Sequence, residues 1–486
     1  MRTSLSRPFV AALAFVAMAA IAPPAPAAER PPNIVVFLID DLGWTDLGCF
    51  GSDLYETPNI DRLAREGMKF TTAYSACTVC SPTSAALMTG KYPARLHVTD
   101  WIHGSKRPKA KLAIPKWTEY LPHEEVTIAA ALKRAGYATA SVGKWHLGDR
   151  KEDWPDRQGF DLNVAGYGAG QPPRYFSPYH IPTLKDGPEG EYLTDRLAAE
   201  AVRFIAANKD RPFFLYFPHY GVHTPLQAKP ELVEKYRKKL HPGMRHTNPT
   251  YAAMIASVDE AVGRVVAKLD ELKLADRTVV VFTSDNGGLL RSTSNGPLRA
   301  GKGAAYEGGV RVPAVVRWPG VTAAGSTCVE PVITPDFYPT LLQIAGTAGD
   351  AKHNAAMDGV SLAPLLKDAK ATLKREAIYW HYPHYHPGGA TPYGAVRAGR
   401  WRLIEFFEDM RLELYDLGAD VGEKADLAAK MPEKAAELRG RLHAWRKAVG
   451  AQMPTPNPNY KPAGLRRPSR QPLGGAAGSA ASSSIR

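Results

Sequence analysis

Cysteine is scarce in this sequence of 486 residues, which contains four: Cys49, Cys77, Cys80 and Cys328. That is too few for a disulfide framework in a chain of this length. Cys77 and Cys80 have the C-x-x-C spacing of redox pairs and of half of many zinc sites. No second C-x-x-C is present, and a thioredoxin-like context is absent. Any functional role of a single cysteine must therefore be inferred from the residues around it in the sequence.

Nucleic-acid-binding motifs are also lacking. The formal net charge of +13 favours a polyanionic partner. The basic residues are scattered, however, and no helix-turn-helix, zinc-finger or RNP pattern accompanies them. Part of the excess charge lies in the two terminal segments. We therefore predict no nucleic-acid partner.

Long apolar runs are limited to one, from Phe9 to Ala22. It is too short to span a bilayer comfortably, and no second run follows, so we predict no stable membrane anchor. Met1-Arg2 and Arg7 precede this run, and Ala25-Pro26-Ala27 follows it. This pattern is typical of a cleaved secretory signal. We predict a signal peptide over residues 1–27 and a periplasmic or secreted mature protein.

The rest of the chain contains enough apolar residues, 44% overall, to bury a large core. Short apolar runs, typical of strands buried on both faces, alternate with segments of helical periodicity. The expected strands are Ile34–Ile39, Ala138–Val142, Phe213–Phe217 and Thr278–Phe282. The expected helices are one capped by Thr127 and stopped by Gly136, then Tyr192–Ile205 and Tyr251–Leu272. This alternation predicts an α/β fold with a large, mostly parallel sheet flanked by helices.

The pattern changes after Leu366. Short strands joined by turns are expected at Ile378–Tyr382, Tyr393–Val396, Arg400–Glu405 and Leu412–Tyr415, followed by a helix over Pro432–Val449. They predict a smaller C-terminal subdomain with an antiparallel sheet, and the chain length suits such a division. We place the main domain at residues 28–366 and the subdomain at 367–453. The Pro-, Gly-, Ala- and Ser-rich residues 454–486 are predicted to be a disordered tail.

Two pairs of oxygen-bearing side chains follow expected strands. Asp40 and Asp41 come directly after the first strand, and Asp285 and Asn286 follow Thr278–Phe282. The carboxyl ends of parallel strands are where α/β sheets bind ligands. An isolated acidic pair would most simply be two solvated loop residues, but two pairs favour a divalent cation that relieves their repulsion. Oxygen ligands favour calcium, with magnesium as the second choice, over zinc.

A third feature is Cys80-Ser-Pro-Thr-Ser84, followed by Ala85-Ala-Leu-Met-Thr-Gly90. This segment resembles the sulfatase signature, Cys-x-Pro-x-Arg followed by a small-residue helix and Thr-Gly. In that family a maturation enzyme oxidises the cysteine to formylglycine, whose hydrated aldehyde is the nucleophile. Cys80 and Pro82 match the signature. Ser84 stands where the family has an arginine that helps to hold the hydrated aldehyde and to recruit the maturation enzyme.

Other blocks resemble the same family in the same order. They are Asn33–Gly43, Thr57–Gly67, Gly143–Gly148, His223–Pro225, Gly301-Lys302 with Glu307–Pro313, Arg400–Ile404 and Leu412–Asp416. The resemblance covers nearly the whole chain between signal and tail, and implies an alkaline-phosphatase-like fold with a catalytic sulfatase domain at 28–366. The catalytic residues it implies are Cys80, Lys144, His146, His223 and Lys302. The calcium ligands it implies are Asp40, Asp41, Asp285, Asn286 and modified Cys80.

These residue types suit the hydrolysis of a sulfate ester. The reaction needs cations for the non-bridging oxygens, a nucleophile, and an acid for the leaving alcohol. Lys144 and Lys302 are compact cations suited to the oxygens. By the resemblance, His223 protonates the leaving alcohol and His146 later accepts a proton as sulfate is expelled.

A sulfated carbohydrate is the expected substrate, because an exported basic protein meets extracellular polyanions. Trp101 and His103 follow the nucleophile segment, and His381 and His384 open the C-terminal subdomain. Aromatic groups beside polar ones suit a sugar ring, so we predict that these four residues bind substrate. The alternative for each is core packing or a domain interface.

Two other functions stay open. Phosphoester or phosphonate hydrolases share this fold, the modified cysteine and the metal ligands. A non-catalytic sulfated-glycan-binding protein is the second alternative, and Ser84 is the residue that favours it.

Overall fold

The computed structural model describes residues 30–461. The predicted signal peptide, residues 1–27, lies outside the described residues. From Pro31 onward the described chain packs as one unit. None of its helices is both long enough and apolar enough to cross a membrane.

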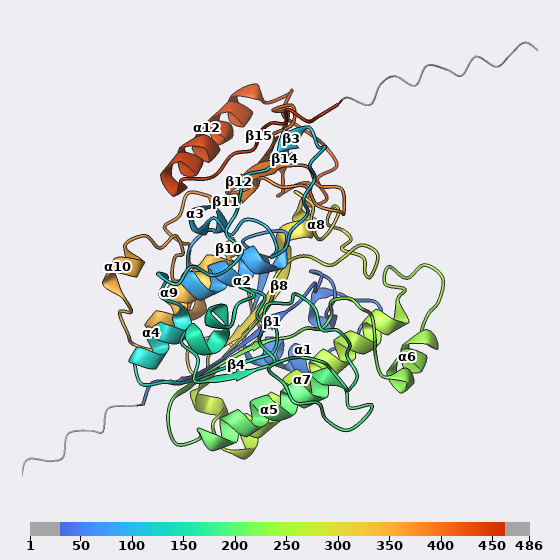
Figure 1. Ribbon diagram of the computed structural model, residues 1–486, viewed down its shortest axis with the longest axis vertical. Helices are drawn as coiled ribbons and strands as arrows, with labels where there is room; N and C mark the ends of the chain where they lie inside the picture. Colours follow the sequence, from blue (N-terminus) through green and yellow to red (C-terminus); the bar gives the residue numbers. More distant parts are fainter. Residues whose placement is uncertain (1–29, 462–486) are drawn as a thin grey trace, which may run out of the picture. The chain divides into compact units, whose positions relative to one another are not determined.

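A nine-stranded, mostly parallel sheet forms the centre of the main domain (Figure 1). Its strands run in the order β10 (Val332–Ile333), β2 (Met68–Tyr74), β8 (Arg311–Arg317), β7 (Thr278–Ser284), β1 (Asn33–Ile39), β6 (Phe213–Pro218), β4 (Ala138–Val142) and β5 (Leu162–Val164), and β9 (Ser326–Cys328) pairs with β2. β8 is antiparallel to both of its neighbours, and the other pairs are parallel. The predicted fold class is confirmed, and the four predicted strands are β1, β4, β6 and β7.

Helices cover both faces of this sheet (Figure 1). Val35 and Phe37 of β1 belong to the core shared with α5 (Leu193–Ala207) and α7 (Pro249–Glu271). Ile34 and Val36 belong to the opposite core, shared with α2 (Cys80–Thr89), α4 (Ile128–Arg134) and α9 (Phe337–Ile344). Because both sets of alternating side chains are buried, β1 has no polar face and forms a continuous apolar run.

The remaining helices of the main domain are shorter or peripheral. They are α1 (Pro58–Glu66), α3 (Pro93–Leu96), α6 (Pro230–Arg237), α8 (Glu307–Val310), α10 (Ala351–Asn354) and α11 (Ala363–Lys367). The predicted cap of α4 is present: the Thr127 hydroxyl accepts a hydrogen bond from the Ala130 amide at 3.0 Å. Such caps satisfy amides that have no partner within the helix.

The C-terminal subdomain is a four-stranded antiparallel sheet. Its strands β11 (Ile378–Tyr382), β12 (Tyr393–Ala398), β13 (Trp401–Phe406) and β14 (Leu412–Asp416) lie in sequence order. α12 (Pro432–Val449) packs on it through Leu438 and Leu442, which share a core with Val396 and Leu403. This arrangement confirms the predicted antiparallel sheet.

The tail prediction needs correction at its start. Within residues 454–461, Thr455–Pro456 forms β15 and pairs with β3 (Leu112–Ala113). The Asn457 amide donates to the carbonyls of Ala110, at 2.7 Å, and Pro108, at 2.9 Å. These backbone partners hold a segment whose composition alone indicated disorder. Residues 462–486 lie outside the described residues.

A buried ion pair joins the C-terminal sheet to the main domain. Arg402 of β13 is completely buried and donates to the carboxylate of Glu307, at the start of α8, and to the Ala305 carbonyl at 2.6 Å. Glu307 also accepts a hydrogen bond from the Tyr74 hydroxyl at 2.8 Å. Removing one member of such a pair leaves the other charge buried without a partner, which costs far more than losing a surface pair.

We expect Arg402→Ala to lower the free energy of unfolding by about 3 kcal/mol. Glu307 would keep Arg311 at Oε2, but its buried Oε1 and the buried Glu423 would both lose their cation. Arg400→Ala is the matched control, an arginine two residues earlier in the turn before β13. Arg400 is exposed and pairs with Asp416, so its loss should change stability little. Urea denaturation of the three proteins measures both effects. Equal losses for the two variants would contradict the role given to the buried pair.

Candidate active site

Four oxygen-bearing side chains meet at one edge of the large sheet. Asp40 and Asp41 follow β1, and Asp285 and Asn286 follow β7. The two strands are parallel, with Ile39 opposite Ser284. The Asp41 amide donates to Asp285 Oδ1 at 3.1 Å, and Asn286 Nδ2 donates to Asp41 Oδ1 at 2.8 Å. All four side chains are buried. Parallel pairing of two strands therefore brings together residues separated by some 245 positions.

Two lysines balance part of this negative charge. Lys144 Nζ lies 2.6 Å from Asp40 Oδ2 and 3.9 Å from Asp285 Oδ2, and Lys302 Nζ lies 2.6 Å from Asp41 Oδ1. Burial is the largest single influence and disfavours the charged amines, but the anionic neighbours together outweigh it, led by Asp40 at Lys144 and by Asp41 at Lys302, and the pKa of each lysine is raised. Both ammonium groups therefore stay charged at neutral pH.

A glycine positions Lys144 after β4. Gly143 has a φ of +127°, and a Cβ there would lie 1.8 Å from the Pro218 carbonyl oxygen. That oxygen accepts a hydrogen bond from the Lys144 amide at 2.8 Å. Only glycine permits this close approach between the ends of β4 and β6, and the turn directs Lys144 toward Asp40.

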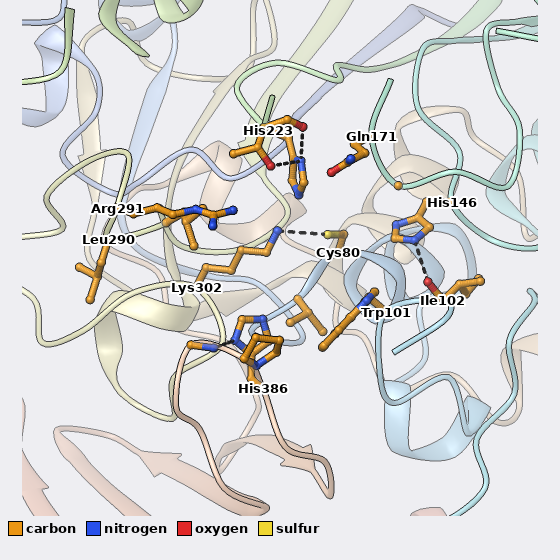
Figure 2. Close-up of a pocket in the computed structure, with 16 residues that line it drawn as sticks. Cys80, Trp101, Ile102, His146, Gln171, His223, Leu290, Arg291, Lys302 and His386 are labelled. Carbon is orange, nitrogen blue, oxygen red and sulfur yellow. Dashed lines mark hydrogen bonds between the residues drawn. The ribbon is translucent and has the colours of Figure 1, made fainter. Parts of the chain in front are cut away.

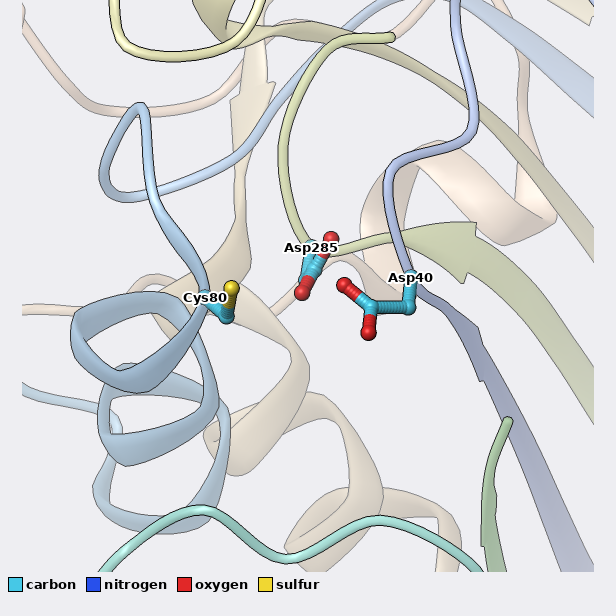
Figure 3. A group of neighbouring side chains, drawn as sticks. All are labelled: Asp40, Cys80 and Asp285. Carbon is cyan, nitrogen blue, oxygen red and sulfur yellow. The ribbon is translucent and has the colours of Figure 1, made fainter. Parts of the chain in front are cut away.

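The acidic cluster fits a divalent cation. Three carboxylates face two ammonium groups, and burial together with the charge of Asp40 raises the pKa of Asp285 well above its usual range. Asp40 Oδ1, Asp41 Oδ2 and Asn286 Oδ1 are buried and have no hydrogen-bond partner among the described residues. In Figure 3, Asp40 and Asp285 face the Cys80 thiol, and one ligand atom from each of the three lies within 4.8 Å of the others. Buried oxygens with no donor are the ligands that calcium and magnesium prefer.

Cys80 is the first residue of α2 and faces the lysines. Its Sγ lies 3.7 Å from Lys302 Nζ. Burial raises the pKa of the thiol to about 12, although Lys144 and Lys302 oppose the rise. The unmodified thiol is therefore protonated at neutral pH. The positive end of the α2 dipole lies at Cys80 and favours an anion there.

Ser84, at the signature arginine position, lies one turn further along α2. Its side chain is buried and hydrogen-bonds the side chain of Tyr216. The position therefore carries a neutral polar pair in place of a cation. Positive charge beside Cys80 comes from Lys144 and Lys302, which both act on the Cys80 thiol electrostatically.

Two histidines flank the cavity above this cluster (Figure 2). His223 Nδ1 lies 2.8 Å from the Thr224 carbonyl, and because a carbonyl can only accept, Nδ1 carries a proton and Nε2 faces Asp41 Oδ2 at 3.7 Å. His146 Nε2 donates to the Ile102 carbonyl at 3.3 Å, and its buried Nδ1 has no partner in the described chain. Burial lowers the pKa of both rings, with further lowering by Lys302 at His223 and by Lys144 at His146.

A cavity of about 720 Å³ opens over these groups. The predicted catalytic residues that line it are Cys80, His146, His223 and Lys302. Lys144 does not line it but contacts Asp40. Trp101 also lines the cavity and meets the ring of His386 edge-on, with centroids 5.2 Å apart.

The other three predicted sugar-binding residues do not line this cavity. His103 is exposed and pairs with Asp149 at 2.6 Å. His381 is buried and bonds the Gln452 carbonyl at 2.8 Å, and His384 is buried and bonds the Thr99 hydroxyl at 2.8 Å. Burial lowers the pKa of His381 to about 4 and of His384 to about 3. Both His381 and His384 are thus packed as structural histidines, which agrees with the alternative of core packing given in the sequence analysis.

His386 was missed by the sequence reading. It lies beyond β11, where the strand period ends, in a turn that continues Pro387-Gly388-Gly389. Gly303, next to Lys302, has a φ of +81°, and a Cβ there would lie 2.0 Å from His386 Nδ1. This glycine allows the C-terminal turn to reach the cavity. The Pro-Gly-Gly sequence predicts a loop here, but it does not predict where the imidazole ring of His386 points.

Comparisons with known proteins agree with this geometry. Residues 32–347 match the family described as Sulfatase, and residues 301–448 match N-sulphoglucosamine sulphohydrolase, C-terminal. A sulfatase of Formosa agariphila is 34% identical over 496 residues, covering 86% of this chain and 89% of that protein. N-acetylgalactosamine-6-sulfatase of Homo sapiens is 35% identical over 412 residues, covering 79% and 74%.

A solved structure extends the comparison. The crystal structure of Ps i-CgsB in complex with k-i-k-neocarrahexaose is 31% identical, has a TM-score of 0.74, and covers 89% of this chain and 95% of that chain. Fold, site and relatives together define an enzyme of the sulfuric ester hydrolase class. The chain belongs to the sulfatase family.

We expect Asp285→Asn to weaken calcium binding at least about tenfold, because it removes a charged ligand. The amide oxygen can still accept from the Asp41 amide, so the fold should survive. Asp100→Asn is the matched control: this carboxyl is buried outside the cluster, and burial raises its pKa well above the usual range. Metal content after dialysis and circular dichroism measure the two effects. Zinc as the tightly retained, activating ion would contradict the ligand assignment.

Proposed function

We propose that this protein hydrolyses sulfate esters of a sulfated saccharide, with Cys80 as the position of the nucleophile. The convergence of Cys80, two charged lysines and a set of unpartnered carboxylate oxygens at the base of one cavity carries this proposal. Overall hydrolysis breaks the bond between sulfur and the ester oxygen. Water supplies an oxygen to the released sulfate and a proton to the alcohol.

Two groups would complete the site. A calcium ion, or less favourably magnesium, held by Asp40, Asp41, Asp285, Asn286 and modified Cys80, would supply charge stabilisation for the sulfate oxygens. Formylglycine, made from Cys80 by a maturation enzyme, would supply the nucleophilic oxygen.

The chain's own residues bind the sulfate and move protons. Lys302 and Lys144 neutralise charge on the non-bridging oxygens, and burial strengthens their effect. His223, in its doubly protonated form, delivers a proton from Nε2 to the leaving alcohol, while its Nδ1 proton stays bonded to the Thr224 carbonyl. His146 accepts a proton at Nδ1, the ring nitrogen that is free. The two histidines can therefore hold opposite roles in one turnover.

Formal charge favours a sulfate over a phosphate ester. Three carboxylates and two ammonium groups leave one negative charge, which a divalent cation would convert to one positive charge. A sulfate monoester has one negative charge, whereas a phosphate monoester has two near neutral pH. Charge balance therefore favours a sulfate ester over a phosphate monoester, whereas a phosphonate monoester or a phosphodiester has the same single charge as the sulfate ester.

The saccharide part of the proposal rests on the cavity. Its volume suits a sugar unit, because small-molecule sites commonly measure about 300–1,000 Å³. Trp101 supplies an apolar face beside polar rings. Relatives named for sulfated sugars, and the neocarrahexaose in a similar structure, support the same substrate class. A periplasmic or secreted location, proposed from the N-terminal signal pattern, would place the enzyme with such polymers.

Mass spectrometry of the native protein should show Cys80 as formylglycine or its hydrate, because Cys80 and Pro82 stand in the signature context. Cys77 should keep its thiol, since Val79 occupies the position where proline is required. The Cys77 side chain also lies outside the cavity lining, and the two residues share one peptide, which makes Cys77 an internal control. An unmodified Cys80 throughout would favour the glycan-binding alternative that Ser84 suggests.

Kinetics on three ester classes test the reaction and the substrate. We expect sulfate release from sulfated saccharides, and faster turnover of an aryl sulfate than of an aryl phosphate. Trp101→Ala should lower kcat/KM about tenfold for the saccharide and much less for the aryl sulfate, which does not use the sugar contact. Trp401→Ala, a partly buried tryptophan in the outer core of the C-terminal sheet, is the control. Faster phosphate turnover, or activity confined to aryl esters, would contradict the proposal.

A further inference from the structure

The cavity wall carries a cation that the proposed reaction does not use. Arg291, in the loop after β7, lines the cavity and is exposed. Its guanidinium has no hydrogen bond or ion pair with any other residue in the described range 30–461. Lys302 also lines the cavity but is paired with Asp41. Arg291 is thus a permanent positive charge that no residue of the described chain neutralises.

The lining contains no acidic residue to balance Arg291. Among the described residues that form the cavity wall there is neither an aspartate nor a glutamate. Figure 2 shows Arg291 extending toward the Lys302 ammonium group, on the opposite side from Trp101. Two cations extended into one cavity repel each other. An anion bound in the cavity would relieve that repulsion.

The side chains near Arg291 in the cavity lining are suited to contact with a sugar ring. An exposed arginine on a loop is commonly solvated, but Arg291 follows Leu290, which is 60% exposed and lines the same cavity. An apolar side chain on this wall faces a cavity whose other wall is formed by Trp101 and His386. A sugar ring between the walls would contact apolar groups on both sides and the guanidinium at its edge.

We infer that Arg291 binds a second anionic substituent of the substrate, a carboxylate or a second sulfate, on the saccharide whose sulfate ester is cleaved. This inference rests on the proposed function and names a narrower substrate class, a saccharide with two or more negative charges. A guanidinium holds either group through two parallel N–H···O bonds, a geometry that an ammonium group cannot offer. Arg291 is therefore a residue for specificity and takes no part in bond cleavage.

The test compares three matched sulfated oligosaccharides. One carries a single cleavable sulfate, one carries in addition a uronic acid carboxylate, and one carries in addition a second sulfate. The measured quantity is the ratio of kcat/KM for each doubly charged substrate to that for the singly charged one, from released sulfate. Arg291→Ala should lower at least one ratio about tenfold, the usual effect of losing a charge-assisted pair. Arg291→Lys should recover only part of it.

Arg65→Ala is the matched control. Arg65, on α1, is an exposed arginine whose guanidinium has no hydrogen bond or ion pair within the described chain, and it lies outside the cavity lining. Its loss changes the net charge equally. It should leave the ratios as they are. The substrate whose ratio falls identifies carboxylate or sulfate as the bound group.

Two outcomes would overturn the inference, and they are distinguishable. If the native enzyme cleaves sulfated oligosaccharides but Arg291→Ala changes all three substrates equally, the proposed function stands and this inference is wrong. If the native enzyme, with Cys80 verified as formylglycine, releases sulfate from none of them, the proposed saccharide function fails and the inference falls with it.

Discussion

The burial of three carboxylates at one sheet edge is the constraint on which the rest of the site depends. Like charges so close together are tolerated only when cations and donors surround them. Lys144 and Lys302 supply two charges from the turn after β4 and from the loop after β7, and a hydrogen bond from the Asp41 amide holds the Asp285 carboxylate. The charge that stays unbalanced fits a divalent cation at this place and an anion bound above it.

Sequence patterns predicted the framework well because its strands have no solvent face. Strands buried on both sides become uninterrupted apolar runs, and residues placed at their carboxyl ends must meet. Asp40 and Asp285 could therefore be assigned to one site from the sequence, and the structure brings them together. The antiparallel β8 and the pairing of β15 with β3 depend on contacts far apart in the chain, which local patterns do not encode.

The cavity wall was the least predictable part. Residues there come from turns, where no period relates sequence position to side-chain direction. His384 is turned into the core beside Thr99, whereas His386, two residues later, reaches the cavity. Arg291 had no sequence signal, because its significance lies in having no partner. Aromatic and histidine content marked Trp101, which lines the cavity, but in the C-terminal segment it marked His381 and His384 and missed His386.

The burial of Cys80 has a consequence for the order of events in the life of the chain. Its side chain is 97% covered, and all ten residues of α2 are buried. An enzyme that must grasp the peptide around Cys80 cannot reach it once α2 has packed against the sheet and the C-terminal subdomain has closed over its start. If Cys80 is oxidised as proposed, its oxidation would therefore compete with folding, and a chain that folded first would keep an unmodified thiol.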